Sequence, residues 1–246
     1  MGRSPWTAAD GLVRLPADRL GVRLPATVTV QNGSPDTGVA PGLLVQITGR
    51  NLGPATQVNA QLDASGRLPF VLSNTIVFFG NLPAPLTSVE ALSIICFAPF
   101  EIASTTEIIV SSNGQRSSAV RARVMPSAPQ ILSIANQDGI PNSADHPAQP
   151  GSVISLYVSG LGETNPPGDD GLVNTAPLPV PLLPVSVFLP GGQVTPQAVE
   201  AAPGQIAGIT QVNVQLPASL AAPAGATPHA VQIGVNSASA TLYLPQ

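Results

Sequence analysis

Short apolar runs, each bounded by Pro, Gly or Asn, recur along the chain. They have the length and the β-branched or aromatic content of strands, and they occupy residues 27–30, 43–48, 74–79, 92–98, 107–110 and 119–124 in the first half and 183–188, 211–216, 231–235 and 241–244 in the second. Asn113-Gly114 favours a tight hairpin turn. No window shows the spacing of a capped amphipathic helix. The pattern therefore predicts an all-β protein.

One apolar run is used twice. The sequence PGLLVQITGRNLG at 41–53 returns as PGSVISLYVSGLG at 150–162, and we call these two copies the signature motifs. In both, Pro-Gly favours a turn and the apolar centre predicts a strand. A self-match at a spacing of about 110 residues predicts an internal duplication of a domain rather than a solenoid repeat. Pro99 follows the first motif by 46 residues and Pro217 follows the second by 55. We expect the nine additional residues in the loop 162–171.

The strand spacing predicts the architecture of each copy. About seven short strands per roughly 100 residues, separated by turn signals, favour an immunoglobulin-like β-sandwich. Two tandem sandwiches fit the duplication and the length of 246 residues. We therefore divide the chain into an N-terminal segment of uncertain structure (1–25), a first sandwich (26–125), a Pro-rich linker (126–130) and a second sandwich (131–246).

The composition excludes several classes of protein. Hydrophobic residues make up 43% of the chain, enough for cores, whereas charged residues make up 9% and Lys is absent. Nine scattered Arg and a net charge of −4 provide no basic stripe, so nucleic acid is not an expected partner. A single Cys excludes an internal disulfide, and no apolar run reaches the ~18 residues of a membrane span. Asp10 and Arg14 interrupt the apolar region that a signal peptide needs, so Met1 either begins a cytoplasmic protein or, as we expect, lies within a longer one.

Several motifs resemble known families. The 41–53 motif is similar to the opening of IPT/TIG domains, which have an immunoglobulin-like fold. A series of four motifs resembles an uncharacterised C-terminal domain of Solibacter-type bacterial secreted proteins. They are ANQDG at 135–139 with Asn142-Ser143, PGSV at 150–153, GLGETNPP at 160–167 and QVNVQLP at 211–217. The resemblance covers roughly residues 26–246, although the first sandwich departs from it at 93–97 (SIICF). It implies a secreted or surface location at the C-terminal end of longer proteins, and it carries no catalytic residues.

Cys96 is predicted to be a core residue. It aligns with Val214 on the apolar face of the strand 211–216, and a buried Cys behaves as a small hydrophobe. A nucleophilic Cys would need a base, and the two histidines, His146 and His229, lie in a loop and before a strand. The chain has no zinc-protease, phosphate-loop or dinucleotide motif. We therefore predict that the protein is not an enzyme and needs no cofactor.

The loop 162–171 is a candidate metal site. Glu163, Asn165, Asp169 and Asp170 crowd it with oxygen donors, the ligands that Ca²⁺ prefers. Their spacing matches no known calcium loop, and two prolines restrict how the loop can wrap around an ion. The alternative is an acidic loop that is simply solvated.

Ile95 and Phe97 form a candidate interaction site. They occupy the strand face where the second copy has Asn213 and Gln215. Exposing both would forfeit roughly 3–5 kcal/mol of burial, so we expect this face to be covered and its counterpart in the second sandwich to be open. The cover would be the N-terminal segment, the second sandwich or a partner chain; the alternative is a local twist of the strand. The N-terminal segment offers Trp6, Leu12, Leu15, Leu20 and Leu24.

These patterns together predict a non-catalytic structural or protein-interaction module of an extracellular or cell-surface bacterial protein. Its partners would be another protein or upstream domains of its own chain. The alternative is a glycan- or polymer-binding module that uses loops at the end of a sandwich, although aromatic residues make up only 4% of the chain. A remote alternative is a hydrolase. Exposed aromatic residues on one sheet face would favour glycan binding, and a histidine in a pocket beside a carboxylate and a Ser would favour the hydrolase.

Overall fold

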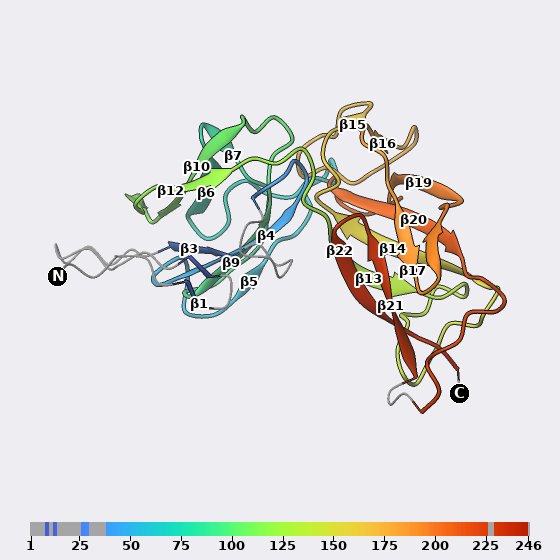
Figure 1. Ribbon diagram of the computed structural model, residues 1–246. Helices are drawn as coiled ribbons and strands as arrows, with labels where there is room; N and C mark the ends of the chain where they lie inside the picture. Colours follow the sequence, from blue (N-terminus) through green and yellow to red (C-terminus); the bar gives the residue numbers. More distant parts are fainter. Residues whose placement is uncertain (1–7, 10–11, 14–25, 30–37, 226–228, 246) are drawn as a thin grey trace.

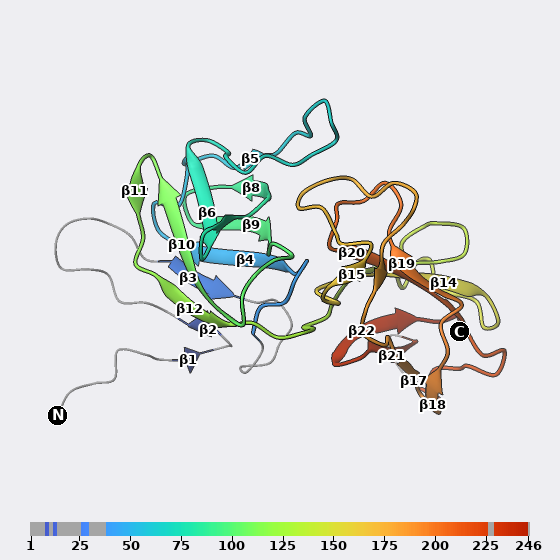
Figure 2. The ribbon, with the colours of Figure 1, turned by 90° about the horizontal axis from the view of Figure 1, so that it is seen from above.

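The chain folds into two lobes that lie side by side (Figure 1 and Figure 2). The computed structural model describes residues 8–9, 12–13, 26–29, 38–225 and 229–245. Within these residues the regular secondary structure consists of strands, without a helix, which confirms the all-β prediction. Each lobe packs two antiparallel sheets around a core, and this is the β-sandwich architecture predicted from the strand spacing.

The first sandwich has a seven-stranded and a five-stranded sheet. In spatial order the first sheet contains β1 (Ala8–Ala9), β2 (Leu12–Val13), β3 (Ala26–Thr29), β4 (Leu44–Gly49), β9 (Ser93–Phe97), β8 (Leu86–Val89) and β5 (Val58–Asn59). The second contains β11 (Gln115–Arg116), β10 (Thr105–Ser112), β6 (Thr75–Phe79) and β7 (Leu82–Pro83), with β12 (Val120–Arg123) also paired to β10.

The second sandwich has two four-stranded sheets and a small two-stranded one. The first sheet contains β13 (Gln130–Ala135), β14 (Val153–Ser159), β20 (Ile209–Gln215) and β19 (Ala198–Ala201). The second contains β18 (Gly192–Val194), β17 (Val187–Leu189), β21 (Ala230–Val235) and β22 (Ala238–Tyr243). The small sheet pairs β15 (Thr164–Asn165) with β16 (Val180–Pro181).

The two sandwiches have the same strand order. The series β3-β4-β9-β8 corresponds to β13-β14-β20-β19, and β7-β6-β10-β12 corresponds to β18-β17-β21-β22. Each signature motif supplies the strand beside β9 or β20, with Val45 opposite Cys96 and Ile154 opposite Val214. An internal duplication requires this correspondence, and the duplication itself stays a prediction.

The additional residues of the second copy do not lie in the loop 162–171, where we expected them. Val89 pairs with Ile94, five residues later, whereas Val199 pairs with Val212, thirteen residues later. Eight of the nine extra residues therefore lengthen the β19–β20 hairpin. The distance between two matched motifs shows that the second copy has more residues, but it does not show in which loop they lie. The acidic loop was the wrong choice, because Gly and Pro are common in all the connections and do not mark an insertion.

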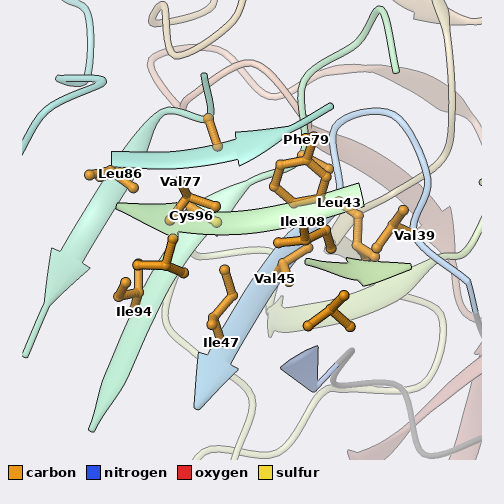
Figure 3. Close-up of a cluster of buried hydrophobic side chains, with 14 of the residues drawn as sticks. Val39, Leu43, Val45, Ile47, Val77, Phe79, Leu86, Ile94, Cys96 and Ile108 are labelled. Atoms are coloured by element: carbon orange, nitrogen blue, oxygen red, sulfur yellow. The ribbon is translucent and has the colours of Figure 1, made fainter. Parts of the chain in front are cut away.

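Each sandwich has its own hydrophobic core. The first joins side chains of both sheets, among them Val45 and Cys96 from one and Val77 and Phe79 from the other (Figure 3). Cys96 has no exposed surface, and burial raises the pKa of its thiol to about 12. The prediction that Cys96 is a core residue is confirmed, because period-2 alternation along β9 places it on the core face.

Local signals predicted some elements and missed others. Asn113 and Gly114 have φ angles of 50° and 78° and connect Ser112 to its partner Gln115, which confirms the predicted hairpin turn. The predicted strand at 183–188 is shortened to Val187–Leu189. Pro184 lacks the N–H that a ladder needs and so breaks this run. Strands β8, β13 and β19 were not predicted.

Candidate functional site: the junction between the two sandwiches

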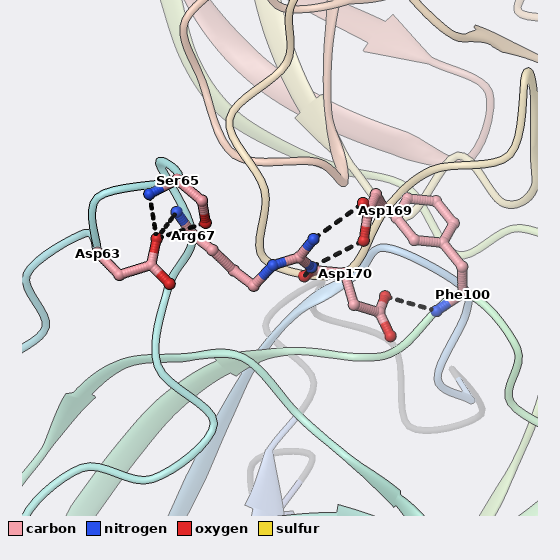
Figure 4. A network of polar contacts seen from close by, with 6 residues as sticks. All are labelled: Asp63, Ser65, Arg67, Phe100, Asp169 and Asp170. Atoms are coloured by element: carbon pink, nitrogen blue, oxygen red, sulfur yellow. Dashed lines mark hydrogen bonds and ion pairs between the residues drawn. The ribbon is translucent and has the colours of Figure 1, made fainter.

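An arginine of the first sandwich clamps the acidic loop of the second (Figure 4). Nη1 and Nη2 of Arg67 donate to the two carboxylate oxygens of Asp169 at 2.7 and 2.9 Å, and Nη1 also donates to the backbone oxygen of Asp170. The turn before Arg67 is shaped by Asp63, whose carboxylate accepts the N–H groups of Ser65 and Arg67 at 2.8 and 3.0 Å. The hydrogen bond from Arg67 lowers the pKa of Asp169. This is a bidentate, charge-assisted contact between residues 102 positions apart.

Main-chain pairing reinforces the clamp. Arg67 and Leu172 form an antiparallel β-bridge. The N–H of Leu68 donates to the carbonyl of Gly171 at 2.9 Å, and the N–H of Val173 donates to the carbonyl of Gly66 at 3.0 Å. The two sandwiches therefore share a short stretch of β-structure.

Asp170 makes a second polar contact across the junction. Its carboxylate accepts the backbone N–H of Phe100 at 3.0 Å. Burial, together with the nearby carboxylates of Glu101 and Asp169, raises the pKa of Asp170 to about 6. The Phe100 ring packs against the backbone of Gly168, where a Cβ atom would lie only 2.4 Å from the ring. Gly168 and Asp170, the residues on either side of Asp169, therefore both contact the first sandwich.

Glycines let the backbones of the two sandwiches touch. Gly208, at the end of the lengthened β19–β20 hairpin, has a φ of 107°, and a Cβ there would lie 2.6 Å from the carbonyl oxygen of Gly42. Gly160 donates its N–H to the same carbonyl at 3.3 Å and accepts the N–H of Ala128 at 2.8 Å. The start of the first signature motif therefore meets the end of the second. The sequence suggested a turn role for Gly42, but close approach is the stronger constraint at this contact.

The face that carries Ile95 and Phe97 is partly covered by the second sandwich. Phe97 is 3% exposed, and its ring lies 3.1 Å from the Cβ position of Gly208. Ile95 remains half-buried beside its cross-strand partners Gln46 and Ser88. In the second sandwich Gln215 is exposed and Asn213 half-buried. Of the three covers that we expected, the second sandwich is therefore the one that buries Phe97.

The expected cover by residues 1–25 falls largely outside the described residues. This applies to Trp6, Leu15, Leu20 and Leu24, and to the side chain of Leu12. At Leu12–Val13 the backbone extends the edge of the sheet by pairing with β3. At that point the segment lengthens the sheet instead of crossing its face.

The predicted calcium loop is a docking loop. Asp169 and Asp170 bind the first sandwich, while Glu163 is exposed and Asn165 lies in the short strand β15. Among the described residues no group of three or more His, Cys, Asp or Glu side chains is arranged to hold a metal ion. The alternative of a merely solvated loop does not hold for Asp169 and Asp170, because their partners Arg67 and Phe100 lie in the other sandwich.

Two grooves follow the junction on either side of Glu163 and Leu182. The first, of about 380 Å³, is lined by Phe100, Glu101, Glu163, Thr164, Asn165, Pro167, Gly168 and Leu182. The second, also about 380 Å³, is lined by Pro41, Ile102, Ser104, Val124, Met125, Pro126, Glu163, Leu182 and Leu183. Leu182 is 58% exposed between them. The junction therefore presents apolar surface together with a few polar groups, as binding grooves commonly do.

Within the part of the chain that the structure describes, neither histidine forms a catalytic group with a serine. His146 Nε2 lies 2.7 Å from a carboxylate oxygen of Asp138, but the hydroxyl of Ser143 accepts the backbone N–H of His146 rather than contacting its ring. Neither junction groove is lined by His146. His229 Nδ1 lies 3.2 Å from the carbonyl of Pro245. These contacts hold loops in place.

Part of the 135–143 motif has a structural role. The side chain of Asn142 donates to Asn136 and to the carbonyl of Tyr243, both at 3.0 Å, and accepts the N–H of Tyr243 at 2.8 Å. Asn136 donates to the carbonyl of His146 at 2.8 Å. The two amides therefore fasten this loop to β22, and no chemistry needs to be assigned to them.

Comparisons with known proteins find similar solved structures. No family model and no curated protein matches the chain. Among solved structures, it is similar to the surface glycan-binding protein PbSGBP-B from Prevotella bryantii, with 13% identity and a TM-score of 0.25 over 87% of this chain and 41% of that one. It is also similar to SGBP-B from a xyloglucan utilization locus in Bacteroides uniformis, with 12% identity and a TM-score of 0.27 over 84% of this chain and 45% of that one. A third similar structure is SGBP-B from the mixed-linkage glucan utilization locus of Bacteroides ovatus, with 11% identity and a TM-score of 0.32 over 87% of this chain and 46% of that one. The chain spans less than half the length of each. The described residues include no helix of the length and apolarity that crossing a membrane requires.

Proposed function

We propose that this chain is a non-catalytic module of an extracellular or cell-surface bacterial protein, in which two sandwiches act as one rigid arm. The observation that carries the proposal is the junction, where an ion pair, a β-bridge and glycine contacts combine. A short linker alone would let two domains reorient. A bidentate clamp beside a main-chain bridge stabilises one orientation, which suits a spacer that presents neighbouring domains or a binding surface. The resemblance to secreted C-terminal domains supports the location.

A distance measurement tests this rigidity. Gln115→Cys and Ser237→Cys place spin labels on exposed sites at turns of the two sandwiches, and the buried Cys96 stays unlabelled. We expect pulsed dipolar spectroscopy to give one narrow distance distribution. A broad distribution in the unmodified background would contradict the rigid arm. The variant Arg67→Ala, which removes the clamp, serves as the comparison and should broaden the distribution.

A second candidate function is binding of a glycan or another polymer. The first junction groove favours it, because loops at the ends of both sandwiches combine the Phe100 ring with the polar groups of Thr164, Asn165 and Glu101. Retardation in gels that contain soluble polysaccharides measures such binding. Unretarded migration in every polysaccharide tested would contradict this candidate and leave the rigid arm unaffected.

A further inference from the structure

One sheet of the second sandwich has an uncharged surface. Along β17, β21 and β22, buried residues such as Leu189, Ile233 and Leu242 alternate with residues that face away from the core. We call the outward residues the outer face: Phe188, Gln193, Gln232, Gly234, Ser239 and Thr241. None of the four strands β18, β17, β21 and β22 contains Asp, Glu, Lys, Arg or His.

The strand registers place these residues next to one another. Phe188 pairs with Gln193 on one side and with Gly234 on the other, and Gly234 pairs with Ser239. The four residues form one row across the four strands. Neighbouring strands lie about 4.8 Å apart, so the row spans roughly 14 Å. A surface of this length suits an extended ligand better than a small molecule.

Phe188 provides an apolar platform in the middle of the row. Its side chain is 43% exposed. A Cβ atom at Gly234 would lie 3.7 Å from Cβ and 4.0 Å from Cδ2 of Phe188, so the ring lies beside bare backbone. No side chain of residue 234 rises next to the ring to shield it. Sugar rings have faces of C–H groups that pack on an exposed aromatic ring of this kind.

The side-chain amides of Gln193 and Gln232, each positioned by a hydrogen bond, lie on the same outer face as Phe188. Gln193 Nε2 donates to the hydroxyl of Ser186 at 3.2 Å, and Gln232 Nε2 donates to the hydroxyl of its cross-strand partner Thr241 at 3.2 Å. Each amide uses one N–H in these bonds and keeps its oxygen and its other N–H for a ligand. Amide and hydroxyl groups match the hydroxyl groups of a neutral sugar in hydrogen-bonding capacity.

The corresponding surface of the first sandwich lacks this combination. Phe78 occupies the position of Phe188, but the Arg116 guanidinium lies over its ring at 5.3 Å from the centroid. Its cross-strand neighbours are Pro83 and Ile109. The same sheet also carries the ion pair of Glu107 and Arg121. The ring there already has a partner, and its surroundings are charged.

We propose that the outer face binds a neutral polysaccharide, with Phe188 stacking on a sugar ring and Gln193, Gln232 and Thr241 binding sugar hydroxyls. The proposal rests on the glycan-binding candidate above and assigns it to a sheet face instead of the junction groove. A charged polysaccharide would find no counter-charge on the four strands, and an anionic one would be repelled by the net charge of −4.

Affinity electrophoresis tests the proposal on the full chain. The probes are hydroxyethylcellulose, galactomannan and arabinoxylan, with the anionic alginate as the charged comparison. We expect retardation by at least one neutral polymer and none by alginate. Phe188→Ala should weaken the binding roughly tenfold, because the stacking surface is lost. Gln232→Ala should weaken it several-fold, and this surface substitution guards against a folding defect of the first variant.

The matched control is Phe78→Ala, which removes the covered ring at the corresponding position and should leave binding unchanged. Equal binding by the native chain, Phe188→Ala and Gln232→Ala would overturn the site but leave glycan binding standing. In that case Asn165→Ala, in the junction groove, should reduce retardation. Absence of retardation by every polymer would overturn both the site and the glycan-binding candidate. Concentration-dependent dimerisation that Phe188→Ala abolishes would also overturn the site, because the face would then be a contact between copies.

Discussion

Strands β9 and β20 occupy the same place in the two sandwiches but differ on one face. Their core-facing residues are alike, with Ile94 and Cys96 corresponding to Val212 and Val214. On the other face β9 carries Ile95 and Phe97, whereas β20 carries polar residues. The Asn213 side-chain oxygen accepts hydrogen bonds from Ser155 and Gln211 at 2.8 and 2.9 Å. The shared core preserves the fold, and the other face is free to differ.

The difference explains how two similar sandwiches form an asymmetric pair. The apolar face of β9 needs cover, and the lengthened β19–β20 hairpin supplies it through Gly208. On the polar face of β20, the side chains form hydrogen bonds with one another, so this face needs no cover. The apolar residues on the outer side of β9 and the longer β19–β20 hairpin of the second sandwich together create this contact.

The largest expected effect comes from filling the contact between the hairpin and the first sandwich. Gly208→Val should destabilise the protein by about 4 kcal/mol, because the side chain meets Gly42 backbone and the residue has a positive φ. Gly204→Val is the control, since that residue also has a positive φ but no atom within 4 Å of its Cβ position. Urea unfolding measures both. Equal losses of unfolding free energy in the two variants would show that the positive φ, and not the contact with Gly42, causes the destabilisation of Gly208→Val.

A substitution that gives β9 the residue of β20 tests the comparison directly. Phe97→Gln should cost about 3 kcal/mol, because it removes a buried aromatic ring and places an amide against Gly208. The reverse change, Gln215→Phe, should alter stability by less than about 0.5 kcal/mol, since that position is exposed. Thermal unfolding measures both. A small effect of Phe97→Gln would mean that the second sandwich does not bury this face.

Removing the clamp should have a smaller effect. Arg67→Ala should cost about 1 kcal/mol after allowance for screening, because Asp169 is largely exposed. Arg121→Ala breaks a longer and more exposed pair within the first sandwich and should be close to neutral. Denaturant unfolding at low and high salt measures both, and added salt should reduce the Arg67 effect. A salt-independent loss would point to lost packing instead of lost charge.

The smallest effect is a change in pH dependence. The pKa of Asp170 is raised to about 6 in the folded protein, so its protonated form is favoured there. Its contribution to stability is full below about pH 4 and is lost as the pH rises through 6. Asp170→Asn should therefore flatten the decline of the unfolding free energy between pH 4 and 7. Asp169, whose pKa is lowered, acts in the opposite sense and at lower pH. Parallel curves for the two proteins would contradict the raised pKa.

Much of the fold could be predicted from local pattern. Alternation along β9 and β20 placed Cys96 and Val214 in the cores, and Asn113-Gly114 placed a hairpin, because both signals depend on residues close together in the chain. Strands β8, β13 and β19 escaped prediction. Pairing with their partners β9, β14 and β20 is what makes these segments strands.

The sequence by itself determined the all-β class, the repeated signature strand and the burial of Cys96, since each follows from side-chain period and turn residues. Only the tertiary structure decided what the loops do. Asp169 and Asp170 could have been calcium ligands or solvated acids, and Arg67 and Phe100, far away in sequence, make them a docking loop. The functional surfaces likewise depend on which face a neighbour covers. Such coverage is a property of three-dimensional packing, and no local pattern records it.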